Sequence, residues 1–123
     1  MNEKDIDFEG KLWKLVDKQH IYKIKEQILK TLMDMNLSVR RVILFGSRTR
    51  GDFTPHSDYD VLIVTHIDLH VEEKMRVFKK LREDLARLGF DVDIILKSEK
   101  EVDYYMTKCG SIVRNALREG ITL

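Results

Sequence analysis

Two carboxylates that stand one residue apart, preceded by a glycine–serine turn, are the residues of this chain best suited to chemistry. Asp58 and Asp60 flank Tyr59, and residues 48–57 separate them from Gly46-Ser47. Side chains alternate along a strand, so both carboxylates lie on one face with their Cα atoms about 7 Å apart. Two neighbouring anions favour a bound cation, and Mg²⁺ and Mn²⁺ prefer oxygen ligands. The spacing therefore predicts a metal site.

The Gly46-Ser47 pair is typical of a turn that binds phosphate. A serine directly after a strand-ending glycine can cap the next helix, whose free N–H groups bind phosphate oxygens together with the hydroxyl. Gly46 and Gly51 have the spacing of a P-loop, but Asp52-Phe53 stands where Lys and Ser or Thr are required. The turn is therefore not a Walker A loop.

A third carboxylate is expected from the apolar run Phe90–Leu96. This run carries Asp91 and Asp93, which again share one face of a strand. Either residue could complete the acidic cluster. We favour Asp93 because it lies deeper in the apolar run, where an unpaired carboxylate is costly and a metal or base role would explain it. Asp91 lies nearer the strand entrance and is the alternative.

The elements that position these residues follow from hydrophobic periodicity. An amphipathic helix is predicted over residues 17–36, and strands over 39–45, about 59–65 and 90–96. A second helix should end at Gly89, and a final helix or helix pair should run from a Ser98 cap to about residue 119. The second helix should turn inward the apolar residues Val71, Met75, Phe78, Leu81, Leu85 and Leu88, and the final segment Ile112, Val113, Ala116 and Leu117. This order predicts an α/β (α+β) fold, a small mixed sheet with helices packed mainly on one side.

Composition limits the class of protein. The 123 residues with 43% hydrophobic side chains predict a single domain over 1–123, with residues 1–9 frayed. Because 22 basic and 21 acidic side chains nearly cancel, nucleic acid is an unlikely partner. Cys109 is the lone cysteine, and no signal or membrane segment is evident, so we expect no membrane association and a cytoplasmic location.

The combined spacing resembles a known signature. Gly46-Ser47, ten residues, then Asp58-Tyr59-Asp60 is similar to the motif of minimal nucleotidyltransferases of the DNA polymerase β-like superfamily. The resemblance covers about residues 39–96, and residues 111–121 are similar to the tails of small members. The short length resembles the MntA-type antitoxins of the HEPN/MNT toxin–antitoxin class.

The resemblance implies a nucleotidyltransferase (polymerase β palm-like) fold and a transferase activity. An acceptor hydroxyl would attack the α-phosphorus of ATP or another NTP and release pyrophosphate. Two Mg²⁺ ions would stabilise the entering and leaving oxygens. The matching positions are Gly46 and Ser47 for the phosphates and Asp58, Asp60 and Asp93 for the ions, with Asp93 as base or orienter of the acceptor. Arg50 or Arg48 would neutralise the triphosphate.

The sequence says least about which molecule supplies the acceptor hydroxyl. The resemblance implies a protein adenylyltransferase that acts as an antitoxin by modifying a tyrosine of a HEPN-type helical toxin. Two alternatives stay open: a non-catalytic module that neutralises a partner by contact, and a transferase acting on a small molecule such as an aminoglycoside. The sequence also leaves open whether the chain forms a homo- or hetero-oligomer.

Overall fold

The computed structural model of the chain describes residues 15–50 and 58–123. Its elements in chain order are α1 (Leu15–Asp34), β1 (Val39–Phe45), α2 (Ser47–Arg50), β2 (Tyr59–Thr65), α3 (Val71–Arg87), β3 (Val92–Ser98), α4 (Glu99–Met106), α5 (Ile112–Glu119) and β4 (Ile121–Thr122). The first two strands occupy the predicted residues. The third begins and ends two residues later than predicted.

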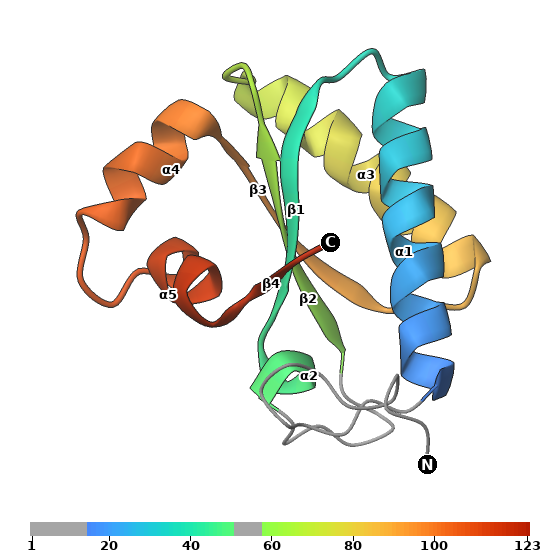
Figure 1. Cartoon of the computed structure of the whole chain (residues 1–123). Coiled ribbons are helices and arrows are strands. Elements are labelled where there is room, and N and C mark those ends of the chain that lie inside the picture. Colours follow the sequence, from blue (N-terminus) through green and yellow to red (C-terminus); the bar gives the residue numbers. More distant parts are fainter. Residues whose placement is uncertain (1–14, 51–57) are drawn as a thin grey trace.

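The strands form one mixed sheet in the order β3-β2-β1-β4 (Figure 1). β1 runs antiparallel to β2 and to β4, whereas β2 and β3 are parallel and are joined through α3. The predicted mixed sheet is therefore confirmed. β4 was not predicted; it pairs with Ile43 and Leu44 of β1.

The two long helices cover one face of the sheet, where α1 and α3 lie side by side (Figure 1). The core on this face joins side chains of both helices to alternate residues of β1 and β2 and to one residue of β3: Ile24, Ile28, Leu32, Val77, Leu81 and Leu85 from the helices, and Val42, Leu44, Tyr59, Val61, Ile63 and Leu96 from the sheet. The inward face predicted for α3 was partly wrong. Val71 and Met75 are 73% and 66% exposed, Leu88 is also exposed, and the buried stripe includes Val77 instead.

The opposite face is covered by the two short helices. Val102 of α4 and Val113 and Ala116 of α5 pack on the alternate side chains of the same strands, which are Ile43, Phe45, Leu62 and Val64. Ser98 caps α4 as predicted, in a capping box with Glu101. The predicted inward orientation of Ile112 was wrong, since its side chain is 57% exposed. The larger helical layer thus lies on one side, with a smaller layer across the sheet.

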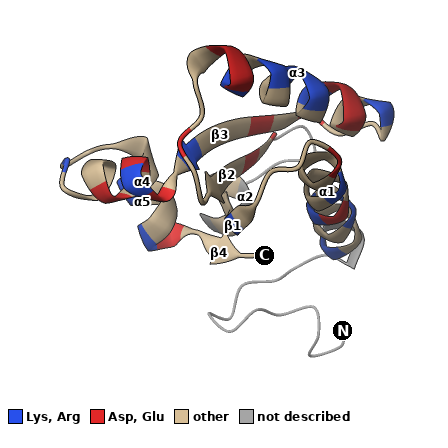
Figure 2. Cartoon of the chain, turned by 90° about the horizontal axis from the view of Figure 1, so that it is seen from above, with Lys and Arg blue, Asp and Glu red and all other residues tan. Residues whose placement is uncertain are grey.

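Basic and acidic residues are interspersed along α1 and α3 (Figure 2), and most of them are exposed. One acid is an exception. Asp84 of α3 is buried, and its Oδ2 accepts a hydrogen bond of 2.7 Å from Oγ1 of Thr31 in α1. Its Oδ1 lies 3.2 Å from Lys80 Nζ and 3.5 Å from Arg87 Nη1. This buried contact ties the two long helices together.

None of the helices in the described ranges combines the length and the apolar character that crossing a bilayer requires.

Candidate functional site

The predicted carboxylates gather where β2 and β3 begin. The parallel register of these strands sets Asp60 opposite Asp93. Neighbouring strands lie about 4.8 Å apart, and register partners point to the same face. Both acids therefore lie side by side on the α4–α5 face of the sheet, in the row that continues into Leu62 and Val64 of β2. Asp60 is half-buried and Asp93 is exposed.

Asp58 and Asp91 stand just before the two strands. Asp58 is exposed and by alternation shares the face of Asp60. The Asp91 carbonyl accepts a hydrogen bond of 3.3 Å from the Tyr59 N–H, which extends the pairing beyond the strand. Asp91 is exposed, as is Asp93. The sequence favoured Asp93 because it was expected to be buried, and this expectation was wrong. What distinguishes Asp93 from Asp91 is its register with Asp60.

Gly46 connects the end of β1 to these acids. Its neighbour Phe45 pairs with Asp60 across the antiparallel strands, and Gly46 adopts φ +83°. A Cβ on Gly46 would lie 2.2 Å from Oδ2 of Asp60. Glycine is needed here twice, because the backbone is left-handed and because the carboxylate occupies the space of a side chain. The glycine turn and the carboxylate are thus in direct contact.

The turn itself is held by Thr49, which the sequence did not single out. Thr49 is only 2% exposed. Its Oγ1 and its N–H both donate to the Gly46 carbonyl, at 2.8 and 3.0 Å. Ser47, half-buried, begins the four-residue α2 directly after Gly46. A buried threonine between two arginines carries no periodic signal, so only the folded turn reveals this contact.

The segment that carries Asp58 and Asp60 is anchored from the other face. Between them Tyr59 is 5% exposed and packs edge-on to Phe90, with ring centroids 6.4 Å apart. The Tyr59 hydroxyl lies 3.3 Å from Nδ1 of His20 in α1, and the His20 ring also contacts Phe90. This aromatic anchor fixes the strand so that both acids face away from it. Alternation within Asp-Tyr-Asp is the signal from which it could have been predicted.

The carboxylates at this end of the sheet fit a divalent cation if a ligand such as a phosphate supplies further oxygens. Asp60 and Asp93 offer adjacent carboxylate oxygens. Among the described residues, however, no three His, Cys, Asp or Glu side chains converge closely enough to hold an ion by themselves. Mg²⁺ characteristically takes one or two carboxylates and completes its shell with waters and substrate phosphates. The arrangement therefore suits an ion that binds together with a phosphate ligand.

Two predicted phosphate contacts cannot be placed. Arg48 and Arg50 belong to α2, but their side chains lie outside the described residues, as does the segment 51–57 between α2 and Asp58. Their role toward a triphosphate stays a prediction.

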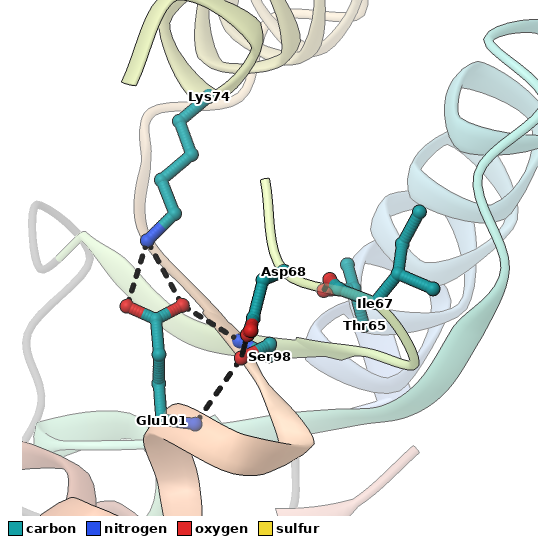
Figure 3. A network of polar contacts seen from close by, with 6 residues as sticks. All are labelled: Thr65, Ile67, Asp68, Lys74, Ser98 and Glu101. Atoms are coloured by element: carbon teal, nitrogen blue, oxygen red, sulfur yellow. Dashed lines mark hydrogen bonds and ion pairs between the residues drawn. The ribbon is translucent and has the colours of Figure 1, made fainter. Parts of the chain in front are cut away.

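The other end of β2 and β3 carries a polar network without a predicted function (Figure 3). Lys74 of α3 donates to both carboxylate oxygens of Glu101 at 2.9 Å, and Glu101 accepts from the Ser98 N–H at 3.0 Å. The Ser98 hydroxyl donates to Asp68. Burial acts to raise the pKa of Glu101, but the bonds from Lys74 and Ser98 outweigh it and lower that pKa. The network fixes α4 to α3 at the end of the sheet remote from the acids.

A hollow of about 370 Å³ adjoins this network. It is lined by Asp68, Leu69, Lys100, Glu101, Tyr104 and Tyr105. Tyr104 is 58% exposed, and the ammonium groups of Lys108 and Lys97 lie over the Tyr104 and Tyr105 rings at 4.9 and 4.8 Å. Val71 and Met75 of α3 are exposed as well, but they do not line the hollow. The lining of the hollow thus combines two tyrosines and one leucine with three charged residues.

Comparison with known proteins gives this geometry a family context. Residues 25–123 match the model of the nucleotidyltransferase domain family. A protein of Methanocaldococcus jannaschii named “Putative protein adenylyltransferase” is 34% identical over 85 residues, which cover 69% of this chain and 78% of that protein.

Solved structures agree. A “putative minimal nucleotidyltransferase” superposes with a TM-score of 0.55 at 26% identity, covering 85% of this chain and 94% of the other. A chain of a toxin–antitoxin MntA-HpeT mutant superposes with a TM-score of 0.51 at 25% identity, covering 80% of this chain and 70% of the other.

Proposed function

We infer, from the premise that this chain belongs to the nucleotidyltransferase domain family, that it moves AMP from ATP to a hydroxyl group of a partner protein. Nucleotidyl transfer follows from the family, whereas donor, acceptor and ion are our proposal. The observation that carries it is the direct contact between the Gly46 turn and Asp60, which in turn is the register partner of Asp93. A phosphate turn that touches a carboxylate pair is what nucleotidyl transfer requires.

In this mechanism the Gly46-Ser47 turn holds the β and γ phosphates, with Arg50 or Arg48 as charge partner. Asp58, Asp60 and Asp93 would hold the divalent ions. Two bound Mg²⁺ ions would supply charge neutralisation at the phosphates and at the entering and leaving oxygens. Asp60, restrained by Gly46 on one side and by strand pairing on the other, keeps its carboxylate in place at little entropic cost.

The reaction forms a bond between the acceptor oxygen and the α-phosphorus and breaks the bond from that phosphorus to pyrophosphate. Asp93 accepts the hydroxyl proton or orients the hydroxyl. Its exposure leaves room for an acceptor side chain that approaches from solvent. A protein acceptor agrees with the named activity of the relative from Methanocaldococcus jannaschii.

For the partner we propose a HEPN-type helical toxin that is modified on a tyrosine, so that this chain acts as its antitoxin. The likeness to a chain of the toxin–antitoxin MntA-HpeT supports this proposal. So does the exposed Tyr104 beside the hollow, because aromatic side chains are enriched in protein–protein interfaces.

The test is transfer of label from [α-³²P]ATP to a HEPN-type toxin that is incubated with this chain and Mg²⁺. Label should appear on a tyrosine of the partner, and Asp58→Asn and Asp60→Asn should each reduce it by about 100-fold or more, as expected for loss of several kcal/mol of charge stabilisation. Asp103→Asn is the matched control, since Asp103 is an exposed acid on α4 away from the site.

Asp93→Asn and Asp91→Asn distinguish the third carboxylate. We expect the first to abolish labelling and the second to leave it within about twofold, because only Asp93 is in register with Asp60. Equal loss in the Asp103→Asn control, or no labelled protein with the wild type, would contradict the proposed activity.

A contact-only module is the second candidate, and the exposed Val71, Met75 and Tyr104 favour it. Such a module would neutralise its partner equally well with Asp58 and Asp60 both changed to Asn. Rescue of growth in cells that express the toxin separates the two candidates. Full rescue by this double variant supports contact alone, and failure of rescue with intact partner binding supports catalysis.

A further inference from the structure

Thr49 occupies an unusual position beside the proposed phosphate turn. It is buried, yet it belongs to the four-residue α2, and a helix this short has little stability of its own. A buried hydroxyl needs a partner, and here Oγ1 donates to the Gly46 carbonyl at 2.8 Å. The Thr49 N–H donates to the same oxygen at 3.0 Å. One carbonyl is thereby held by two donors of one residue.

The direction of this carbonyl also fixes the next N–H. The Gly46 carbonyl and the Ser47 N–H belong to one planar peptide unit, so in the trans form they point in opposite directions. A rotation of this unit would turn the Ser47 N–H by the same angle. The two bonds from Thr49 prevent this rotation at a glycine whose backbone is otherwise permissive.

The same unit touches the acidic pair. Gly46 lies against the Asp60 carboxylate so closely that there is no room for a Cβ. Movement of the Gly46 carbonyl therefore changes the packing of Asp60 as well as the direction of the Ser47 N–H. Through this one peptide, Thr49 therefore influences both the direction of the Ser47 N–H and the position of the Asp60 carboxylate.

We propose that Thr49 is a positioning residue for nucleotide binding, whose hydroxyl locks the Gly46–Ser47 peptide so that the Ser47 N–H faces the phosphates and Asp60 keeps its place. This inference rests on the proposed function and assigns to Thr49 a role in ATP affinity. In this role Thr49 acts through the Gly46–Ser47 peptide and makes no contact with the nucleotide itself.

The chain offers a matched control at the far end of the same sheet. Thr65 is 1% exposed, and its Oγ1 donates to the Ile67 carbonyl at 2.9 Å (Figure 3). Thr49 in α2 and Thr65 at the end of β2 are thus two buried threonines that each donate a hydrogen bond to a backbone carbonyl, toward opposite ends of the sheet. Replacing either by Val removes the hydroxyl and nearly keeps the shape.

The experiment measures the dissociation constant of ATP with Mg²⁺ by titration calorimetry, together with the thermal midpoint, for the full chain. Thr49→Val should weaken ATP binding by about 3- to 10-fold, and Thr49→Ser should restore it to within about twofold of the wild type. Thr65→Val should lower the thermal midpoint much as Thr49→Val does but leave ATP affinity within about twofold. Thr49→Ala serves if Thr49→Val does not fold, and should lose affinity to the same extent.

The possible results separate the two levels of the proposal. If the wild type binds ATP and Thr49→Val or Thr49→Ala binds equally well, the positioning role is wrong and the proposed function stands. The role is also wrong if Thr65→Val loses as much affinity as Thr49→Val, because the effect is then one of stability. If the wild type does not bind ATP, the proposed function is refuted and the role of Thr49 with it.

Discussion

Gly46→Ala should destabilise the protein much more than the same substitution at a left-handed glycine that has open space around it. Two separate costs arise at this position, a left-handed backbone at φ +83° and a Cβ that would meet Asp60 Oδ2 at 2.2 Å. Gly89 supplies the control, because it has φ +87° but open space where an alanine Cβ would lie. Comparison of the two substitutions isolates the contact with the carboxylate.

The expected magnitudes follow from these two costs. An alanine in the left-handed region costs about 1–2 kcal/mol, offset in part by about 0.4–1 kcal/mol from its stiffer unfolded chain. Gly89→Ala should therefore lower the free energy of unfolding by about 1 kcal/mol. Displacement of a packed group adds about 1–3 kcal/mol. Gly46→Ala should accordingly cost about 2–4 kcal/mol.

A double-mutant cycle with Asp60→Ala tests the origin of the difference. This change removes Oδ2 and Cγ of residue 60 and leaves only its Cβ, at 3.3 Å from where the Cβ of an alanine at position 46 would lie. In the Asp60→Ala background, Gly46→Ala should cost about 1 kcal/mol, like Gly89→Ala. Urea unfolding followed by circular dichroism measures each value. Equal costs for Gly46→Ala and Gly89→Ala, or a cost of Gly46→Ala that Asp60→Ala leaves unchanged, would refute the reasoning.

Three further predictions concern pH, helix capping and metal. The hydrogen bond from Thr31, against the opposing effect of burial and with help from Lys80 and Arg87, lowers the pKa of Asp84 below its ordinary value of 3.8. The stabilisation is therefore present above that value and is lost as pH falls through the lowered pKa. Between about pH 6 and about pH 3 the urea concentration at the midpoint of unfolding should therefore fall less steeply for Asp84→Asn than for the wild type. Parallel curves for the two proteins would contradict this. Ser98→Ala breaks the capping box with Glu101 and the bond to Asp68, and should cost about 1–2 kcal/mol in thermal unfolding; a loss below about 0.5 kcal/mol would argue against the network. Chelation by EDTA should weaken ATP binding by about 10-fold or more, and Mg²⁺ should restore it, because the carboxylates then face phosphate charge without a cation; unaltered binding would exclude a shared ion.

The fold was predictable where burial is nearly continuous. β1 and β2 occupy the residues expected from sequence, since residues 42–45 of β1 and nearly all of β2 are buried, and these apolar runs are bounded by polar or glycine residues. The face of α3 was harder, because its exposed Val71 and Met75 continue the apolar period of Leu81 and Leu85. The two-residue β4 is too short to carry any period. The side of the sheet on which α4 packs depends on the path of the chain after β3, which periodicity does not encode.

The site was predictable in its residue types and less so in its contacts. Alternation alone places Asp58 and Asp60 on one face. The pairing of Asp60 with Asp93 is a tertiary register, and the contact of Gly46 with Asp60 depends on the antiparallel pairing of β1 and β2. The hydrogen bonds of Thr49 depend on the turn geometry. The roles assigned to Asp58, Asp60, Asp93, Gly46, Ser47 and Arg50 stay predictions until the variants are measured.

The row of side chains that begins with Asp60 and continues into Leu62 and Val64 also acts against misfolding. Both faces of β2 are occupied, so a slip of one residue would turn Asp60 into the space of Tyr59 and Val61, which are 5% and 0% exposed. A buried, unpaired carboxylate is costly, so misregistered chains are strongly disfavoured. The acids that would bind the ions therefore also favour the correct strand pairing during folding. Neutral replacements at Asp60 should increase the share of misfolded protein, even where the native fold tolerates the replacement well.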